Sequence, residues 1–241
     1  SIKSIDKDNF IITAKYDNYG INLNELVGDE RAEAVKKIKE SKDYEILDEI
    51  PFWSNGNGFT NKKRNRLYVY NRINGELTPI SDTISNVSYY SYKDGVILYV
   101  INRYKDKQEQ REAIYSYDIK NKKTELILPG EDYRVNFVEF FGEGILCGLN
   151  DTLKYGINQN PDFYMIKNGK LELFKKHDTW MVNTVGSDCR YGGGKNFRVK
   201  DNKLYFLTTV MHDAFLSTID TDGNEKILTK AKGSVDSYAI G

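Results

Sequence analysis

RLYVYN at residues 66–71 turns at Asn74-Gly75 into ELTPI at residues 76–80, and this pattern decides the fold. Apolar and polar residues alternate on both sides of the turn, as a half-buried β-hairpin requires. The pattern returns three times, with spacings of 47, 49 and 52 residues between the equivalent positions Tyr68, Tyr115, Tyr164 and Leu216. A repeat of this length indicates that one supersecondary unit is used several times.

An inner hairpin precedes each of the later copies. Residues 87–100, 137–149 and 197–207 alternate in the same way around short turns rich in Asp, Asn and Gly. Two hairpins in each period of about 50 residues give four antiparallel strands per repeat, which is typical of β-propeller blades. We therefore expect an all-β protein, a β-propeller of four-stranded blades with one short helical insertion.

The repeats predict one propeller fragment of about four to five blades over residues 1–241. We expect a partial blade at 1–81 with inner strand 10–15 and helical insert 17–65, whole blades at 84–129, 133–177 and 194–230, and the start of a next blade at 231–241, with its strand from Tyr238. A propeller closes by pairing its first and last blades, and an open stack leaves edges unpaired. So few blades predict an incomplete ring, whose open edges offer a route to self-association.

One helix is expected, at residues 29–41. Asp29 is placed to cap its first turn. The helix should pack on the surface through an apolar stripe formed by Ala32, Val35 and Ile38.

Composition argues against two classes of partner. The chain has 35 basic and 35 acidic side chains and no net charge, so neither nucleic acid nor a membrane surface is expected to bind it through bulk charge. The longest strongly apolar run, residues 96–101, is far shorter than the roughly 20 residues that span a bilayer. The first residue is Ser1 instead of Met and no signal peptide follows, so a fragment is expected.

The two cysteines favour a reduced, cytoplasmic protein, because Cys147 and Cys189 are too few for a disulfide framework. Cys147 lies in an apolar run and is expected in the core.

Recognisable catalytic and cofactor motifs are missing. The sequence has two histidines, His177 and His212, and no Gly-x-Ser-x-Gly, so a Ser-His-Asp site cannot be assembled. GGGKN at 192–196 lacks the residues of a phosphate loop. GNGFTN at 56–61 departs from a dinucleotide fingerprint and is interpreted as a tight turn. We expect no catalytic residue, no cofactor and no metal in this chain.

Two polar runs have simpler interpretations than ligand binding. DTDGN at 220–224 carries oxygens suited to calcium, but it falls where the fourth hairpin must reverse, and a turn is expected. KKRNR at 62–66 is a brief basic run in a neutral chain and is interpreted as a solvated loop.

The long connections are predicted to share one face. Residues 17–65, 103–112, 150–162 and 177–195 fall between second and third strands or between blades, whereas the short hairpin turns belong to the opposite face. Long ordered loops on a rigid scaffold often carry binding residues. The candidates for substrate gating or domain contact are therefore Trp53, Arg103, Tyr155, Trp180, Asp188, Arg190 and Tyr191. Asp188 and Arg190 have the alternative role of bracing their own loop.

Four segments of the sequence support a family resemblance. A charged helix precedes YEILDEIPFWSNGNGF at 44–59, with its aromatic-x-x-Gly-x-Gly-Phe turn, and GELTPI at 75–80 supplies a Gly-Glu hairpin turn. SDCR at 187–190 and GSVDSY at 233–238 are similar too. Together they resemble, over most of the chain, the propeller of bacterial acylaminoacyl peptidases and dipeptidyl aminopeptidases, which belong to the prolyl oligopeptidase family of serine peptidases.

The resemblance implies a module without chemistry of its own. In that family, the propeller precedes and covers an α/β-hydrolase domain that carries the Ser, Asp and His, none of which can be placed here. The implied partners are this C-terminal hydrolase domain and peptide substrates, whose access the propeller would gate by size.

Two alternatives remain open. One is a free-standing propeller that acts as a scaffold or binds a ligand. The other is a small glycosidase propeller, which needs two carboxylates about 5 to 10 Å apart. Its nominal pair is Glu139 and Asp188.

Overall fold

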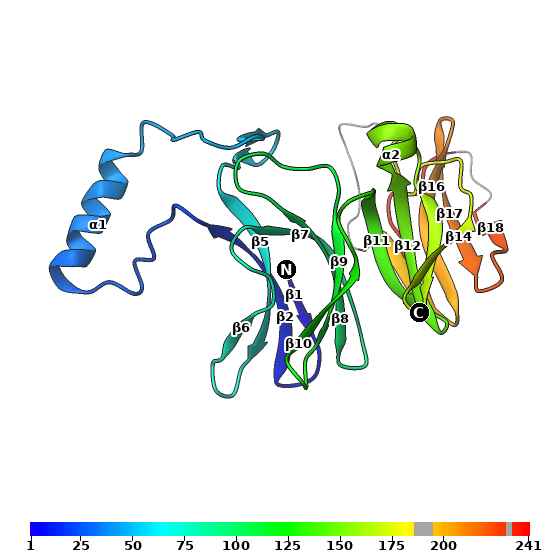
Figure 1. Cartoon of the computed structure of the whole chain (residues 1–241), viewed down its shortest axis with the longest axis horizontal. Coiled ribbons are helices and arrows are strands. Elements are labelled where there is room, and N and C mark those ends of the chain that lie inside the picture. The colour runs from blue at the N-terminus through cyan, green and yellow to red at the C-terminus, as the bar shows by residue number, and fades with distance from the viewer. Residues whose placement is uncertain (186–194, 230–232) are drawn as a thin grey trace. The chain divides into compact units, whose positions relative to one another are not determined.

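The computed structural model describes residues 1–185, 195–229 and 233–241 (Figure 1). Its strands form four four-stranded sheets and one two-stranded hairpin, which confirms the predicted all-β propeller architecture. The chain divides into two compact units, residues 1–88 with 102–109 and residues 89–101 with 110–241. Among the described residues, no helix is both long and apolar enough to cross a membrane.

The first sheet has the strand order β1-β2-β5-β6 and consists of β1 (Ile2–Ser4), β2 (Asn9–Asp17), β5 (Lys63–Asn71) and β6 (Leu77–Pro79). It has four strands where a partial blade was expected, because the short β1 pairs with β2 from Ile2 opposite Ile12 to Ser4 opposite Phe10. Residues 9 and 17 of β2 face residues 71 and 63 of β5, so the turns at 5–8 and 72–76 lie at one end of the sheet. The long insert leaves from the other end.

The insert contains α1 (Gly28–Glu40), β3 (Trp53–Ser54) and β4 (Gly58–Phe59). The predicted tight turn is confirmed: β3 and β4 form a hairpin in which Gly56 and Gly58 have φ of 79° and 70°, values that favour glycine.

Two details of the helix prediction were wrong. The N-cap residue is Val27 rather than Asp29, because Asp29 already lies inside the first turn. Ala34 is the buried residue of α1, whereas Ala32 and Ile38 are exposed, because the predicted stripe does not lie against a sheet. Figure 1 shows α1 between two long segments without regular structure.

The other three sheets lie within the three predicted whole blades. The second has the order β10-β9-β8-β7 and consists of β7 (Ser85–Lys93), β8 (Val96–Arg103), β9 (Ala113–Asp118) and β10 (Lys123–Leu128). The third runs in chain order through β11 (Tyr133–Phe141), β12 (Gly144–Asp151), β13 (Asp162–Lys167) and β14 (Lys170–Lys175). The fourth likewise contains β15 (Phe197–Lys200), β16 (Lys203–Val210), β17 (Asp213–Asp220) and β18 (Glu225–Ile227).

Connections within the third sheet separate as predicted. The hairpin turns at 142–143 and 168–169 lie at one end of the sheet. The link with α2 (Thr152–Tyr155) and the 3-10 helix η1 (Gly156–Asn158) lies at the other end (Figure 1). That the long links of all four sheets share one face stays a prediction, and one of its test positions, Gly192, lies outside the described residues.

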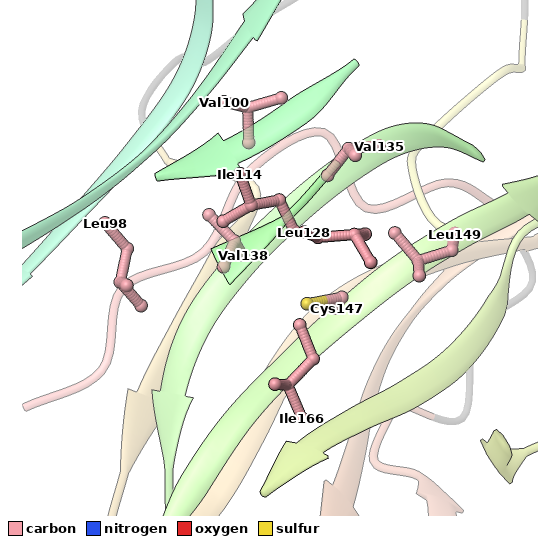
Figure 2. Packing of buried hydrophobic residues seen from close by; sticks show 9 residues of the cluster. All are labelled: Leu98, Val100, Ile114, Leu128, Val135, Val138, Cys147, Leu149 and Ile166. Carbon is pink, nitrogen blue, oxygen red and sulfur yellow. The ribbon is translucent and has the colours of Figure 1, made fainter. Parts of the chain in front are cut away.

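A hydrophobic core joins the second and third sheets. Figure 2 shows its nine buried side chains, which come from strands β8 to β13: Leu98, Val100, Ile114, Leu128, Val135, Val138, Cys147, Leu149 and Ile166. Cys147 is fully buried, as predicted, and burial raises the pKa of its thiol. Cys189 lies outside the described residues.

A second core joins the third and fourth sheets, because each strand of the third sheet has apolar residues on both faces. In β12, Leu146 faces the fourth sheet while Cys147 and Leu149 face the second. In β11, the register shifts between Val135 and Phe137. A bulge there reverses the alternation, so Val135 joins the first core and Phe137 the second.

The two ends of the chain do not complete a common blade. In the described part of the chain, no strand of the first sheet pairs with a strand of the fourth. The strand expected from Tyr238 is not formed, since residues 234–241 have no regular structure. Instead, the Tyr238 hydroxyl lies 2.8 and 2.7 Å from the backbone oxygens of Asn196 and Tyr205 and attaches the end of the chain to the fourth sheet.

Candidate functional site

Four of the seven predicted contact residues lie in the described part of the chain. In the first unit, Trp53 is 52% exposed on β3, and its ring meets that of Phe59 edge-on at 5.1 Å. Arg103 ends β8 and donates through Nε to Asp82 at 3.0 Å. Both side chains are accessible, and Arg103 is already held by a surface carboxylate.

In the second unit, Tyr155 ends α2 with an exposed ring, and the ammonium of Lys154 lies 4.9 Å from its centre. Trp180 is partly buried and accepts a backbone hydrogen bond from Thr209 at 3.0 Å. Asp188, Arg190 and Tyr191 lie outside the described residues. A gating role for the seven stays a prediction.

Glu139, one of the two nominal glycosidase carboxylates, is buried and already occupied. The Tyr89 hydroxyl donates to it at 2.5 Å, and the Lys195 ammonium forms an ion pair with it. Burial raises the pKa of Tyr89 well above its usual value, and the Glu139 carboxylate adds to this effect. Because Asp188 lies outside the described residues, the distance between the two carboxylates is not tested.

The imidazole of His177 lies between a carboxylate and a hydroxyl. Its Nδ1 lies 3.2 Å from the carboxylate of Glu225, and its Nε2 lies 2.8 Å from the hydroxyl of Thr179. The imidazole is 5% exposed, and the hydroxyl of Thr179 is also bonded to that of Thr208 at 2.6 Å. A nucleophile must reach its substrate. We therefore interpret this network as a structural link among the segment after β14, β16 and β18.

A buried ion pair that the sequence did not predict lies in the first unit. KKRNR at 62–66 was interpreted as a solvated loop, which was wrong, because β5 begins at Lys63 and Arg64 is 1% exposed. Arg64 donates through Nη1 and Nη2 to the two oxygens of Glu49, at 2.9 and 2.5 Å. Its guanidinium lies 3.7 Å from the centre of the Tyr104 ring.

The remaining donors of Arg64 are also satisfied. They bind the backbone oxygens of Ile84, Tyr104 and Lys63 at 3.3, 3.1 and 3.0 Å. A buried ion pair is tolerated when further hydrogen bonds satisfy its polar atoms. Arg64 therefore fastens the insert, which carries Glu49, to β5 and to the segment after β8.

Charged and polar groups around this pair strengthen the attachment. The Lys62 ammonium lies 3.5 Å from Asp48 and 3.6 Å from Asp106, and it donates to the backbone oxygen of Lys105 at 2.6 Å. The Tyr19 hydroxyl donates to Asp48 and lowers the pKa of that carboxyl. Ile50 exchanges backbone hydrogen bonds of 2.8 Å with Asp106 and Gln108.

A cavity of about 250 Å³ lies beside this attachment, between β2, β5, the β3–β4 hairpin and residues 104–108. Four amide side chains line it, those of Asn57, Asn65, Asn86 and Gln108. Lys15 and Lys63 contribute positive charge, and in the part of the chain that the structure describes no Asp or Glu lines the cavity. Trp53 and Arg103 are not among these residues. Nothing in the sequence pointed to this site, because its walls come from five separate segments, which include β7 through Asn86.

Comparisons with known proteins identify the fold. Three crystal structures of acylaminoacyl peptidase are similar: the orthorhombic form and the uncomplexed form from Pyrococcus horikoshii, and a complex with Z-Gly-Gly-Phe-chloromethyl ketone. Their TM-scores are 0.63, 0.62 and 0.63, and the identity is 14% in each case. They cover 98%, 97% and 98% of this chain.

This chain covers only 32% or 33% of each peptidase chain, so it spans about a third of their length. No protein-family model matches the sequence, and no curated protein matches it. At this identity the likeness establishes the propeller fold.

Proposed function

We propose that this chain is the non-catalytic propeller module of a serine peptidase of the prolyl oligopeptidase family. Its partner is then the α/β-hydrolase domain that follows it in the parent protein, and a cytoplasmic location fits its cysteines. The observation that carries the proposal is the extent of the likeness: nearly the whole chain follows about one third of an acylaminoacyl peptidase.

In this proposal the module selects peptides by size. The blades supply stiff walls, because continuous apolar cores join the second, third and fourth sheets. Such walls, placed over a catalytic pocket, admit short unfolded peptides and exclude folded proteins. Trp53, Arg103, Tyr155, Trp180, Asp188, Arg190 and Tyr191 are the proposed gating or domain-contact residues.

The test compares the parent protein with a variant that lacks residues 1–241. Rates are measured on a short chromogenic peptide, on a folded protein and on the same protein after unfolding. Removal of the gate should raise cleavage of the folded protein relative to the peptide. Labelling by a serine-directed probe shows that the truncated hydrolase is still folded.

Unchanged selectivity in a labelled, truncated hydrolase would contradict gating. A parent reading frame without a hydrolase domain would instead favour a free-standing scaffold or ligand-binding propeller.

We also propose that open blade edges support self-association, since unpaired strand edges are templates for pairing. Sedimentation velocity over a range of concentrations tests this, and a monomer at every concentration would contradict it.

A further inference from the structure

We infer that the cavity beside the β3–β4 hairpin binds the carboxylate of a peptide, either at its C-terminus or on an acidic side chain. This inference rests on the proposed function, in which peptides are the substrates. The cavity lies entirely within the first unit, and its walls come from β2, β5, the insert and the single residues Asn86, Tyr104 and Gln108.

The charges on the cavity wall are unbalanced. Lys15 donates to the side-chain oxygen of Asn57 at 3.3 Å, and Lys63 donates to the backbone oxygen of Phe59 at 3.2 Å. Both partners are neutral, and the described residues that line the cavity include no carboxylate. The neighbouring Lys62, by contrast, forms ion pairs with Asp48, Glu49 and Asp106. Two ammonium groups with neutral partners favour an anionic ligand.

The remaining cationic group of the wall is not available to a ligand. Arg64 lines the cavity, but Glu49 occupies both ends of its guanidinium. Phosphate is usually recognised by such a planar guanidinium or by a concave array of backbone N–H groups. Either ammonium group can pair with a peptide carboxylate, and because lysine also binds phosphate as a point charge, inorganic phosphate is one of the ligands compared below.

The other lining groups suit a peptide. The amides of Asn57, Asn65, Asn86 and Gln108 can both donate and accept, as a peptide group requires. Asn86 already accepts from the backbone N–H of Asn65 at 2.9 Å through its oxygen, which leaves its NH₂ group to donate.

Size and shape favour the end or a single side chain of a peptide. Small-molecule sites usually enclose about 300 to 1,000 Å³. This cavity, at about 250 Å³, is smaller, and Phe59 and Tyr104 give it aromatic walls.

The walls are held in place before a ligand arrives. Thr60 donates to the backbone oxygen of Phe52 at 2.8 Å, and Asn57 to that of Ser54 at 3.1 Å, which fixes the hairpin. Tyr104 lies against the guanidinium of Arg64, which Glu49 fixes in turn. A site that is ordered in advance loses less entropy on binding.

The experiment measures binding of three short N-acetylated peptides to the full 241-residue chain. One ends in a free carboxylate, one is its C-terminal amide, and one is an amide that contains a single Glu. Trp53 fluorescence in a Trp180→Phe background reports on the cavity, since Trp53 contacts Phe59, and calorimetry gives affinities. At least one carboxylate peptide should bind about tenfold more tightly than the plain amide.

Substitutions test the two lysines. Lys15→Ala combined with Lys63→Ala should weaken binding of that peptide by about tenfold or more. Lys36→Ala combined with Lys37→Ala is the matched control, because it removes the same two positive charges from exposed ion pairs on α1. Circular dichroism establishes that the variants are folded, and Lys15→Gln with Lys63→Gln provides a second neutral pair.

Equal affinity for the acid and amide peptides would overturn the inference, as would carboxylate binding that neither lysine pair weakens. Tighter binding of inorganic phosphate than of either carboxylate peptide would also overturn it and would assign the cavity to a different anion. The gating proposal is tested separately, by rates of the parent protein. A propeller can gate by size without holding a carboxylate, so the two failures are distinguishable.

Discussion

Glu49 and Arg64 bind each other through two hydrogen bonds while their side chains are 0% and 1% exposed. The two residues are fifteen positions apart, one in the insert and one at the start of β5. Their contact attaches the long insert between β2 and β5 to the first sheet.

Removal of one partner should therefore destabilise the first unit strongly. Glu49→Gln leaves the Arg64 charge buried without a counter-charge, and we expect a loss of about 3–5 kcal/mol in the free energy of unfolding. Urea unfolding followed by Trp53 fluorescence measures it. Arg103→Gln is the control, because it breaks an exposed pair with Asp82 and should cost at most about 1 kcal/mol.

A double variant separates charge from packing. Glu49→Leu with Arg64→Met removes both charges, so its loss should be smaller than that of Glu49→Gln. Equal losses for Glu49→Gln and Arg103→Gln would show that the buried pair is no more important than a surface pair.

Gly148 marks the tightest approach in the second core. A Cβ atom there would lie 2.5 Å from Cε1 of Phe137, whose ring stacks on that of Phe197 at 4.1 Å. Gly148→Ala should therefore cost about 1–3 kcal/mol in the free energy of unfolding, as overpacked cores usually do. Thermal and urea unfolding measure the change.

The control for Gly148→Ala is the same substitution in a Phe137→Leu background, where the side chain at position 137 is smaller. If the clash with Phe137 is the cause, the second substitution should cost less in that background than in the unmodified chain. An equal cost in both would assign the effect to the backbone of β12 instead.

The sequence predicts the three whole blades because alternation along a strand is a local signal. It predicts the turns for the same reason: Asn168 and Gly169, for example, take φ of 52° and 73°, as a tight hairpin turn needs. β1 carries no such signal, since Ile2–Ser4 is too short for alternation to be visible. Its strand exists because β2 offers an edge for pairing.

The sequence did not predict the features that depend on contacts between residues far apart in the chain. No spacing rule connects Glu49 with Arg64, so a basic run looked like a solvated loop although Arg64 is buried. The cavity is equally non-local, with Lys15 and Lys63 on neighbouring strands and Asn57 on the hairpin. The exposed candidate Trp53 was found because an aromatic residue in a long connection is a local pattern.

The purified chain should not hydrolyse aminoacyl or dipeptidyl chromogenic substrates. The hydroxyl of Thr179 is bonded to Thr208, and the His177 imidazole beside it is buried between the rings of Phe163 and Phe206. Hydrolysis that a serine-directed inhibitor abolishes would contradict this expectation. Hydrolysis lost in Thr179→Ala but kept in Ser187→Ala would assign activity to the His177 network.

Tyr164 on β13 predicts a pH dependence of stability in the alkaline range. Burial raises the pKa of its hydroxyl from 10.0 to about 12, with smaller contributions from Tyr133 and Asp162. Below pH 10 the hydroxyl is protonated in both folded and unfolded chains, so its contribution to stability is fully present. Between about pH 10 and pH 12 the unfolded chain loses the proton first, which favours unfolding. The free energy of unfolding should therefore fall across this window.

Tyr164→Phe isolates this contribution, because phenylalanine keeps the ring and cannot ionise. The unmodified chain and the variant should have parallel stability curves below pH 10, and the variant should lose less stability between pH 10 and about 12. Because the pKa values of other tyrosines, such as Tyr89 and Tyr238, are also raised, the variant should still lose some stability as the pH rises. Urea unfolding at successive pH values measures both curves, and tyrosinate absorbance follows the ionisation directly. Identical curves over the whole range would mean that Tyr164 ionises equally easily in the folded and unfolded chains.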